Sequence, residues 1–459
     1  MRFPPGRHFA VAWHLPDGHG GMTSALLHRS RAFARLGGVH VDVLTFDARP
    51  DYPALERRLR DAGELGPGVG LVNLYDWLRM HPVPGGRFDP ARTPLAPLAE
   101  GVVAARDGIP MSRTRLAADG VTVLQRDHYR PDGTLLLSDR RDAPDGRRSV
   151  VLCDERGRPV RGWRRMRSLY AAWLDRLAGD EPAFLIVDST VSAQNLLDYR
   201  RPGSTIVHVL HNSHLADPDD PAGELRPRRR AVLERLYVFD ATVVLTDRQR
   251  AELAVRVGPG PELVVIPNSR ELPPRGPLRR DARHAAVLAS LTGRKKVQRA
   301  IRATGRIAGS RLDVYGEGDR RAFLEEVAAA QPHGAVVFHG HRPDARVRLA
   351  EASVLLLTSR FEGSPLVLHE AMGAGCLPIA VDIRYGPRDV IRHGVDGWLV
   401  PPGDQRALDR AVREAMSTPA WRLALMRLAA RRSAARYRDE EITRRWGRLL
   451  ARLARDASR

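Results

Sequence analysis

Two glutamates, Glu362 and Glu370, lie eight positions apart in the stretch RFEGSPLVLHEAMGAGCLP, residues 360–378. Glu362 belongs to a glycine-containing turn, and Glu370 follows a mostly apolar run. If the apolar run forms a helix, the carboxylate of Glu370 is costly to bury there unless a partner hydrogen-bonds to it. The paired hydroxyls of a sugar can do so, and one charge-assisted hydrogen bond is worth roughly 1.5–3 kcal/mol. The simpler alternative is that Glu370 is an exposed helix residue and Glu362 a partner of the helix dipole.

A helix start lies between the two acids. Ser364 suits the N-cap and Pro365 the first turn, and the strand-like run VLLLTS comes just before. The helix is therefore expected to begin at the carboxyl edge of a sheet. Backbone N–H groups and the positive dipole end make such a helix start an anion site that suits a diphosphate. We expect the site to be lined by Gly363, Ser364, Pro365 and Leu366.

Two further loops follow strands and carry residues that could do chemistry. The stretch HGGMTSALLHR comes after the first strand, and its Gly20 and Gly21 would let backbone amides approach a pyrophosphate. The stretch VLHNSH places His211 after another strand. His211 and His214 could form a metal pair, but no third ligand is evident nearby, so no metal site is expected. A purely structural role for His211 remains an alternative.

Strands and helices alternate along two parts of the chain, which predicts two doubly wound α/β domains. Ligands bind outside the carboxyl ends of the strands in such sheets, so two domains facing one another would form an interdomain cleft. Hairpin signals punctuated by PDG and ERG turns interrupt the first series and predict an antiparallel β insertion. A stretch rich in proline, glycine and arginine, 267–283, looks like a linker. The expected boundaries are 1–107 with 165–268 for the N-terminal domain, 108–164 for the insertion, 275–430 for the C-terminal domain, and 431–459 for a basic C-terminal helix.

The composition limits the class of protein. The chain has 459 residues, of which 43% are hydrophobic, so a packed core is expected. No apolar run is long enough to span a bilayer, the N-terminus does not read as a secretory signal, and two cysteines cannot form a disulfide framework. These features favour the cytoplasm. The net charge of +20 favours anionic partners such as nucleic acid, acidic lipid or phosphate-bearing substrates, although arginine on solvated faces explains it equally well.

The segment LTSRFEGSPLVLHEAMGAGCLPIAVDIRYGP resembles the E-x7-E region of retaining glycosyltransferases of GT-B family 4. The motifs VIPNS, VYGEGDRRAFLEEV, VVFHGHRPD and GVDGWLVPPGD lie in the order found in that family. The motifs GGMTSALLHR, LHNSH and DIRYGPRDVI, together with the hairpin insertion, resemble the poly(glycerol-phosphate) α-glucosyltransferase group, which modifies wall teichoic acid. The resemblance covers most of the chain and implies the GT-B fold.

The resemblance implies roles for individual residues. Glu370 would bind the ribose of the donor, Glu362 the donor sugar, and His211 would lie near that sugar. Lys295 in SLTGRKKVQRAI matches the lysine that neutralises the diphosphate, whereas Ser290 stands where the family has arginine. Arg294 or Lys296 could supply the missing charge. A solvated basic helix start is the alternative for Arg294 and Lys295.

The expected activity is therefore the retaining transfer of glucose or N-acetylglucosamine from a UDP-sugar, without a metal or another cofactor. The expected acceptor is a hydroxyl of a polyanionic cell-wall polymer, with serine-rich proteins as a close alternative. The alternative hypothesis, from another functional class, is an inactive GT-B protein that binds polyanions. No nucleic-acid partner is expected. Peripheral contact with the inner face of the membrane and a homo-oligomer formed through the β insertion remain open at this point.

Overall fold

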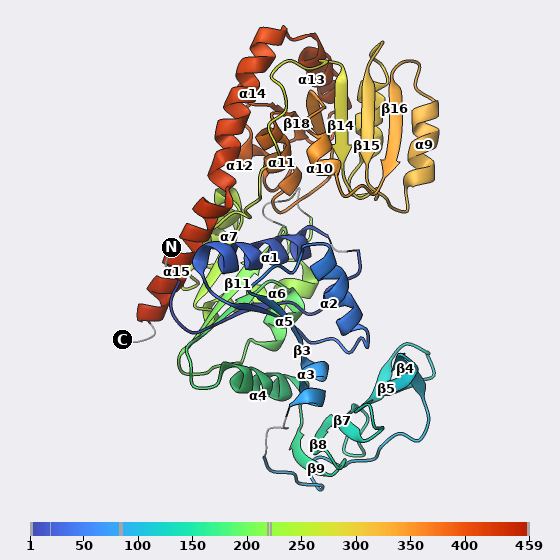
Figure 1. Cartoon of the computed structure of the whole chain (residues 1–459), viewed down its shortest axis with the longest axis vertical. Helices are drawn as coiled ribbons and strands as arrows, with labels where there is room; N and C mark the ends of the chain where they lie inside the picture. Colours follow the sequence, from blue (N-terminus) through green and yellow to red (C-terminus); the bar gives the residue numbers. More distant parts are fainter. Residues whose placement is uncertain (1–2, 19, 82–85, 218–219, 221–222, 457–459) are drawn as a thin grey trace. The chain divides into compact units, whose positions relative to one another are not determined.

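The computed structural model describes residues 3–18, 20–81, 86–217, 220 and 223–456 (Figure 1). The chain forms two compact units. One contains the residues up to 208 together with those from 450 onward, and the other contains residues 209–449. The boundary falls within strand β11 (Ser204–Leu210) of the first sheet. The predicted domain boundaries stay predictions.

Seven strands form the first sheet, in the order β13-β12-β11-β10-β1-β2-β3. Pairing is parallel from β11 through β10, β1 and β2 to β3, and between β12 and β13. All five side chains of β10 are buried, as expected for a parallel sheet covered on both faces. The other strands of this sheet are β1 (Arg7–Val11), β2 (Val41–Thr45), β3 (Val69–Asn73), β10 (Ala183–Val187), β12 (Ala241–Val244) and β13 (Leu263–Val265).

The helical segments between these strands are α1 (Gly21–Ala32) with the π-helical turn η1 (Phe33–Gly37), α2 (Tyr52–Asp61), α3 (Leu74–Met80), α4 (Met166–Ala178), α5 (Thr190–Asn195), α6 (Pro227–Leu233), η2 (Leu236–Val238) and α7 (Asp247–Val257). Helix α3 follows β3 without a connecting loop. The side chain of Asn73 accepts hydrogen bonds from the amides of Tyr75 and Asp76 and so starts α3.

The second parallel sheet has the strand order β16-β15-β14-β17-β18-β19 and lies entirely in the unit 209–449. Its strands are β14 (His284–Leu288), β15 (Arg311–Tyr315), β16 (Ala335–Gly340), β17 (Val354–Leu357), β18 (Leu377–Val381) and β19 (Trp398–Val400). The helices of this region are α8 (Val297–Thr304), α9 (Arg321–Ala329), α10 (Ala345–Arg348), α11 (Leu366–Ala374), α12 (Pro387–Val390), α13 (Gln405–Ser417) and α14 (Ala420–Ala434).

A third sheet is antiparallel and takes its strands in chain order, from β4 to β9. The strands are β4 (Val102–Arg106), β5 (Ile109–Leu116), β6 (Val123–Tyr129), β7 (Leu135–Arg140), β8 (Ser149–Cys153) and β9 (Pro159–Trp163). Strand β4 lies ahead of residue 108, the expected start of the insertion. The turn into β5 is Asp107-Gly108 with φ of 51° and 80°, the Asp-Gly signal of a two-residue hairpin. This confirms an antiparallel insertion.

Arginine side chains that are partly or fully buried hold the predicted linker 267–283 in place. The guanidinium of Arg280 donates to the carbonyls of Ala352 and Ala374, each at 2.6 Å, and Arg427 donates to Leu278 O at 2.7 Å. Arg431 reaches the carbonyl of Gly276 in the same way. The segment therefore packs as part of the unit that carries the second sheet.

The chain ends with η3 (Ala435–Tyr437) and the long helix α15 (Asp439–Asp456). The predicted C-terminal helix extends to 459, and its last three residues lie outside the described ones. Within the described part of the chain, no helix combines the length and apolar character that crossing a bilayer requires.

Candidate functional site

Neighbouring strand ends bring Lys295 and Glu362 together. Strands β14 and β17 are parallel neighbours, so the loops that follow them leave the same edge of the sheet. The Nζ atom of Lys295 lies 2.5 Å from Oε1 of Glu362. The two loops are also joined through their backbones, because the hydroxyl of Thr358 donates to the carbonyls of Lys295 and Lys296 at 3.0 Å.

Arg294 completes a cluster of two cations around one carboxylate. Its Nη1 lies 2.9 Å from Oε1 of Glu362 and donates to Phe361 O at 2.9 Å, and its guanidinium stands 5.4 Å from the centre of the Phe361 ring. Glu362 is only 8% exposed. Burial raises the pKa of Glu362, but Lys295 and Arg294 more than offset this and hold it below its ordinary value. The carboxylate is therefore charged at neutral pH.

Ser290 is exposed at the end of β14. Its backbone carbonyl accepts a hydrogen bond from Thr292 N at 2.9 Å, within the loop that leads to Lys295. Ser290 lacks the positive charge of the arginine that the resemblance leads one to expect here. Arg294, four residues further on, brings a guanidinium group to Glu362 instead. The geometry thus favours Arg294 over Lys296 as the second cation beside Lys295. Lys296 caps α8 with a left-handed backbone, φ 51°.

Helix α11 begins one residue later than the sequence pattern predicts. Pro365 is the N-cap, with an extended backbone at φ −71° and ψ 101°, and no side chain caps the helix. The prediction that Ser364 is the N-cap is therefore wrong. The first amide used within the helix is that of Leu368, which donates to Pro365 O at 3.0 Å, so the amides of Leu366 and Val367 precede the intrahelical ladder.

Gly363 is in the closest backbone contact of the site. A Cβ atom placed there would lie 1.6 Å from the carbonyl oxygen of His211. Only glycine allows this approach, because real Cβ contacts are never this short. The contact fixes the loop that follows β11 against the loop that follows β17, and both belong to the unit 209–449. His211 itself is 8% exposed. Its predicted place beside a donor sugar stays a prediction.

Glu370 is buried and paired, which excludes the alternative of an exposed helix position. It is 3% exposed, and its Oε1 lies 3.3 Å from Nε of Arg270 and 3.1 Å from Nε of Arg346. Arg270 is buried, whereas the side chain of Arg346 is half exposed. Sequence reasoning missed both arginines. Arg270 directly follows the motif VIPNS, which was a usable signal, but nothing in the sequence points to Arg346.

A buried polar cluster lies beside the turn that carries Glu362. The amide of Tyr385 donates to Glu362 O at 2.8 Å, and its hydroxyl donates to Oε2 of Glu252 at 2.6 Å. The ring of His214 stacks on Tyr385 and is fully buried, and this burial lowers the pKa of His214 to about 4. His214 is therefore neutral at physiological pH. Among the described residues, no group of His, Cys, Asp or Glu could hold a metal ion.

Gly20 and Gly21 lie in the other unit, at the start of α1. Gly20 is the N-cap with φ −84° and ψ −174°, and a Cβ atom at either glycine would meet nothing within 4 Å. Packing against the residues that the structure describes therefore does not require glycine at these two positions. The space in front of them is open, as an approach of phosphate groups to the backbone would need.

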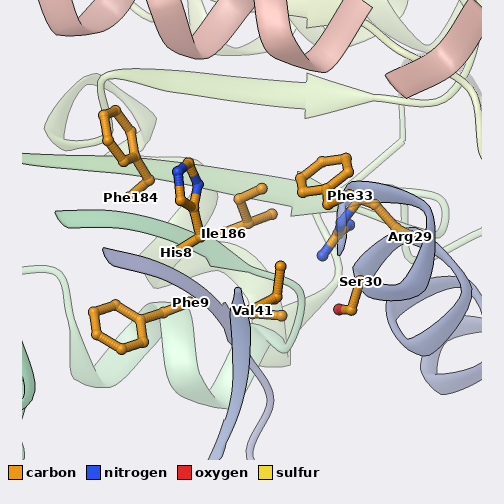
Figure 2. Close-up of a pocket in the computed structure, with 9 residues that line it drawn as sticks. His8, Phe9, Arg29, Ser30, Phe33, Val41, Phe184 and Ile186 are labelled. Carbon is orange, nitrogen blue, oxygen red and sulfur yellow. The ribbon is translucent and has the colours of Figure 1, made fainter. Parts of the chain in front are cut away.

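A small hollow near α1 is not a candidate for the donor site. It is lined mainly by apolar side chains of β1, β2, β10 and η1, including Phe33, Phe184 and Ile186 (Figure 2). His8 stacks on Phe184 at its rim, with ring centres 4.8 Å apart. Arg29 points into it but forms a buried ion pair with Asp188 at 2.6 Å. None of the predicted site residues lines this hollow.

Comparison with known proteins finds a family model that matches the region of the second sheet. Residues 282–418 match the family model described as glycosyl transferases group 1. This segment contains Lys295, Glu362 and Glu370 and confirms the resemblance inferred from the motifs.

Two curated relatives match the chain in part. An exopolysaccharide phosphotransferase of Streptomyces coelicolor is 32% identical over 231 residues, which are 48% of this chain and 24% of that protein. A poly(glycerol-phosphate) alpha-glucosyltransferase of Bacillus subtilis is 22% identical over 251 residues, which are 52% of this chain and 37% of that protein. The chain thus spans less than half the length of either relative.

A solved structure matches nearly the whole chain. It is a TarM mutant of S. aureus in complex with fondaparinux, alpha-GlcNAc-glycerol and UDP, with a TM-score of 0.78 and 17% identity over 97% of this chain and 100% of that one. The two parallel sheets and the antiparallel sheet therefore form the predicted GT-B fold.

Proposed function

We propose that this chain, whose residues 282–418 are a domain of the glycosyl transferases group 1 family, is a retaining hexosyltransferase. Its donor would be a UDP-linked glucose or N-acetylglucosamine. Its acceptor would be a hydroxyl of a polyanionic cell-wall polymer such as poly(glycerol phosphate). The observation that carries the proposal is the pair of buried carboxylates, Glu362 and Glu370, each held by two cations at one edge of the second sheet.

The reaction exchanges one bond at the anomeric carbon for another on the same face of the sugar. The bond from that carbon to the diphosphate breaks through an oxocarbenium-like transition state, and the bond to the acceptor oxygen forms. The acceptor proton passes to the departing phosphate oxygen. Negative charge therefore grows on the diphosphate, where preorganised cations stabilise it most effectively. We assign this role to Lys295 and Arg294, with the amides at the start of α11.

The ion pair at Glu362 suggests how the cations are held ready. Two positive groups close together repel one another, and the buried carboxylate keeps both in place. An incoming diphosphate would then share Lys295 with Glu362, while the second carboxylate oxygen of Glu362 could accept a sugar hydroxyl. Glu370 would likewise accept hydroxyls of the ribose, with Arg270 fixing its orientation. The positive charges come from side chains, so we propose that no metal ion is needed.

Two assignments concern other parts of the chain. We propose that the open backbone at Gly20 and Gly21 receives a donor phosphate, because no described side chain lies within 4 Å of a Cβ atom placed at either glycine. We also propose that His211 contributes near the sugar, since its backbone is locked to Gly363.

The deciding experiment is a donor screen with the purified chain. Each common nucleotide sugar is incubated with poly(glycerol phosphate), with a serine-rich peptide, or with no acceptor. Released nucleoside diphosphate and the mass of the product are measured. A mass gain of one hexose or N-acetylhexosamine on the polymer supports the proposal. Modification of the peptide alone moves the acceptor class to protein, and a gain of hexose phosphate would reveal a phosphotransferase. If no donor releases nucleoside diphosphate, the result favours a protein that only binds polyanions.

A further inference from the structure

Helix α14 exposes an apolar stripe on the face that points away from the protein core. Trp421 is 67% exposed, Leu425 58% and Leu428 40%. The spacing of four and three residues places the three side chains in one line along the helix. The opposite face, with Leu423, Met426 and Ala430, is buried, and α14 packs there against α11. Figure 1 shows α14 as a long helix at the margin of the unit that contains the second sheet.

Arginine is the only charged residue type in the segment 420–438, which carries this stripe and ends before the acidic first turn of α15. Between 420 and 438 the sequence has six arginines and no aspartate or glutamate. Two of them, Arg427 and Arg431, turn inward and donate to backbone carbonyls. Arg422 and Arg432 are exposed on α14, Arg432 on the same line as the stripe and Arg422 beside its first turn. Arg436 and Arg438 are exposed just beyond the helix.

We propose that Trp421, Leu425 and Leu428, with Arg422 and Arg432, form a docking surface for a membrane that contains anionic lipid. Tryptophan and leucine on one side of a helix, flanked by arginine, suit the boundary between headgroups and acyl chains. Each cation near an anionic leaflet adds to the attraction. A second copy of the chain fits this surface less well, because it would bring arginines against arginines. This inference goes beyond the proposed transferase activity and does not depend on it.

The test measures co-sedimentation of the whole chain with vesicles of phosphatidylcholine, with and without phosphatidylglycerol. The wild-type chain should bind only the anionic vesicles, and less at high salt. The double variant Trp421→Ser/Leu425→Ser should bind at least about tenfold more weakly, because it loses most of the inserted apolar area. The matched control is Val255→Ser, which removes a side chain that is 84% exposed on α7.

The charge is tested separately, with the apolar stripe intact. Arg422→Glu/Arg432→Glu should also weaken binding by about tenfold or more, whereas Arg302→Glu, an exposed arginine of α8, should not. All of these side chains are exposed, so melting temperatures should stay unchanged, and so should release of nucleotide with a soluble acceptor. The proposal is overturned if the wild type does not bind anionic vesicles or if both double variants bind as well as the controls. It also fails if the stripe variants break up a dimer or abolish retention on an acidic protein while vesicle binding persists.

Discussion

The ammonium group of Lys295 is bonded to the carboxylate of Glu362, 2.5 Å away. Resemblance assigns the first residue to the diphosphate of a sugar donor and the second to its sugar, yet in the chain itself they are partners. A bound diphosphate would have to compete with this carboxylate for the same positive charge. Replacing either residue therefore also changes the electrostatic surroundings of the other.

Lys295→Ala should lower the rate of UDP release by more than about tenfold, because one of the two cations near the leaving group is lost. Lys296→Ala is the matched control, since that side chain belongs to the residue that caps α8 with a left-handed backbone. The rates are measured at saturating donor. A rate close to that of the wild type would instead assign the diphosphate charge to Arg294.

Glu370→Gln should weaken UDP binding by about tenfold or more, because a charge-assisted hydrogen bond of roughly 1.5–3 kcal/mol becomes a neutral one. It should also destabilise the fold, because buried Arg270 loses its charged partner. Arg346→Ala removes the half-exposed partner and should cost less than about 1 kcal/mol. Calorimetric titration with UDP, well below the melting temperature, separates affinity from stability. Unchanged affinity in Glu370→Gln would remove this residue from the ribose site.

Gly363→Ala and Gly21→Ala should behave in opposite ways. At Gly363 the new methyl group would meet His211 O at 1.6 Å, so the loop must move, and both the melting temperature and the activity should fall. At Gly21 the methyl group meets nothing, so the melting temperature should stay the same or rise slightly, while donor binding weakens if phosphates approach this backbone. Normal donor affinity in Gly21→Ala would argue against a phosphate site there.

His369→Phe should make the protein less sensitive to acid. His369 is fully buried, neither ring nitrogen has a hydrogen-bond partner among the described residues, and burial lowers its pKa to about 3. The unfolded chain binds a proton below about pH 6.5 while the folded chain does not, so stability falls as the pH decreases from there towards 3. Between pH 7 and pH 5 this amounts to about 2 kcal/mol. Urea unfolding at both pH values measures it, and an equal loss in wild type and variant would refute the assignment.

Activity should survive a chelator, because the proposed mechanism takes the positive charge near the leaving group from Lys295, Arg294 and the backbone at α11. The measurement is UDP release after dialysis against EDTA, compared with the same sample supplied with magnesium. Loss of activity that magnesium restores would refute the metal-independent mechanism.

The sequence predicted the sheets well, because a short apolar run bounded by turn residues indicates a strand wherever its partner strands lie in the chain. Local chemistry explains why the antiparallel sheet begins ahead of residue 108, because Asp107-Gly108 is a hairpin turn that needs a strand on either side. Ser364 suited an N-cap, but the tight packing of Gly363 on His211 and of Pro365 on Gly386 places the helix start one residue later. Of the two arginine partners of Glu370, Arg270 follows the motif VIPNS, whereas Arg346 comes from a segment that no local pattern connects with Glu370.

The arginines that fasten residues 276–280 have a consequence for protein engineering. Arg280 reaches carbonyls on two different segments at once, and Arg427 reaches both Leu278 O and the hydroxyl of Ser353. A lysine has a single terminal nitrogen and cannot span such a pair of acceptors. Recoding the chain with lysine would therefore preserve its net charge of +20 but loosen this connection. Some of the arginines therefore hold the fold together through the chain's own carbonyls, and only the remaining ones are available to attract a polyanion.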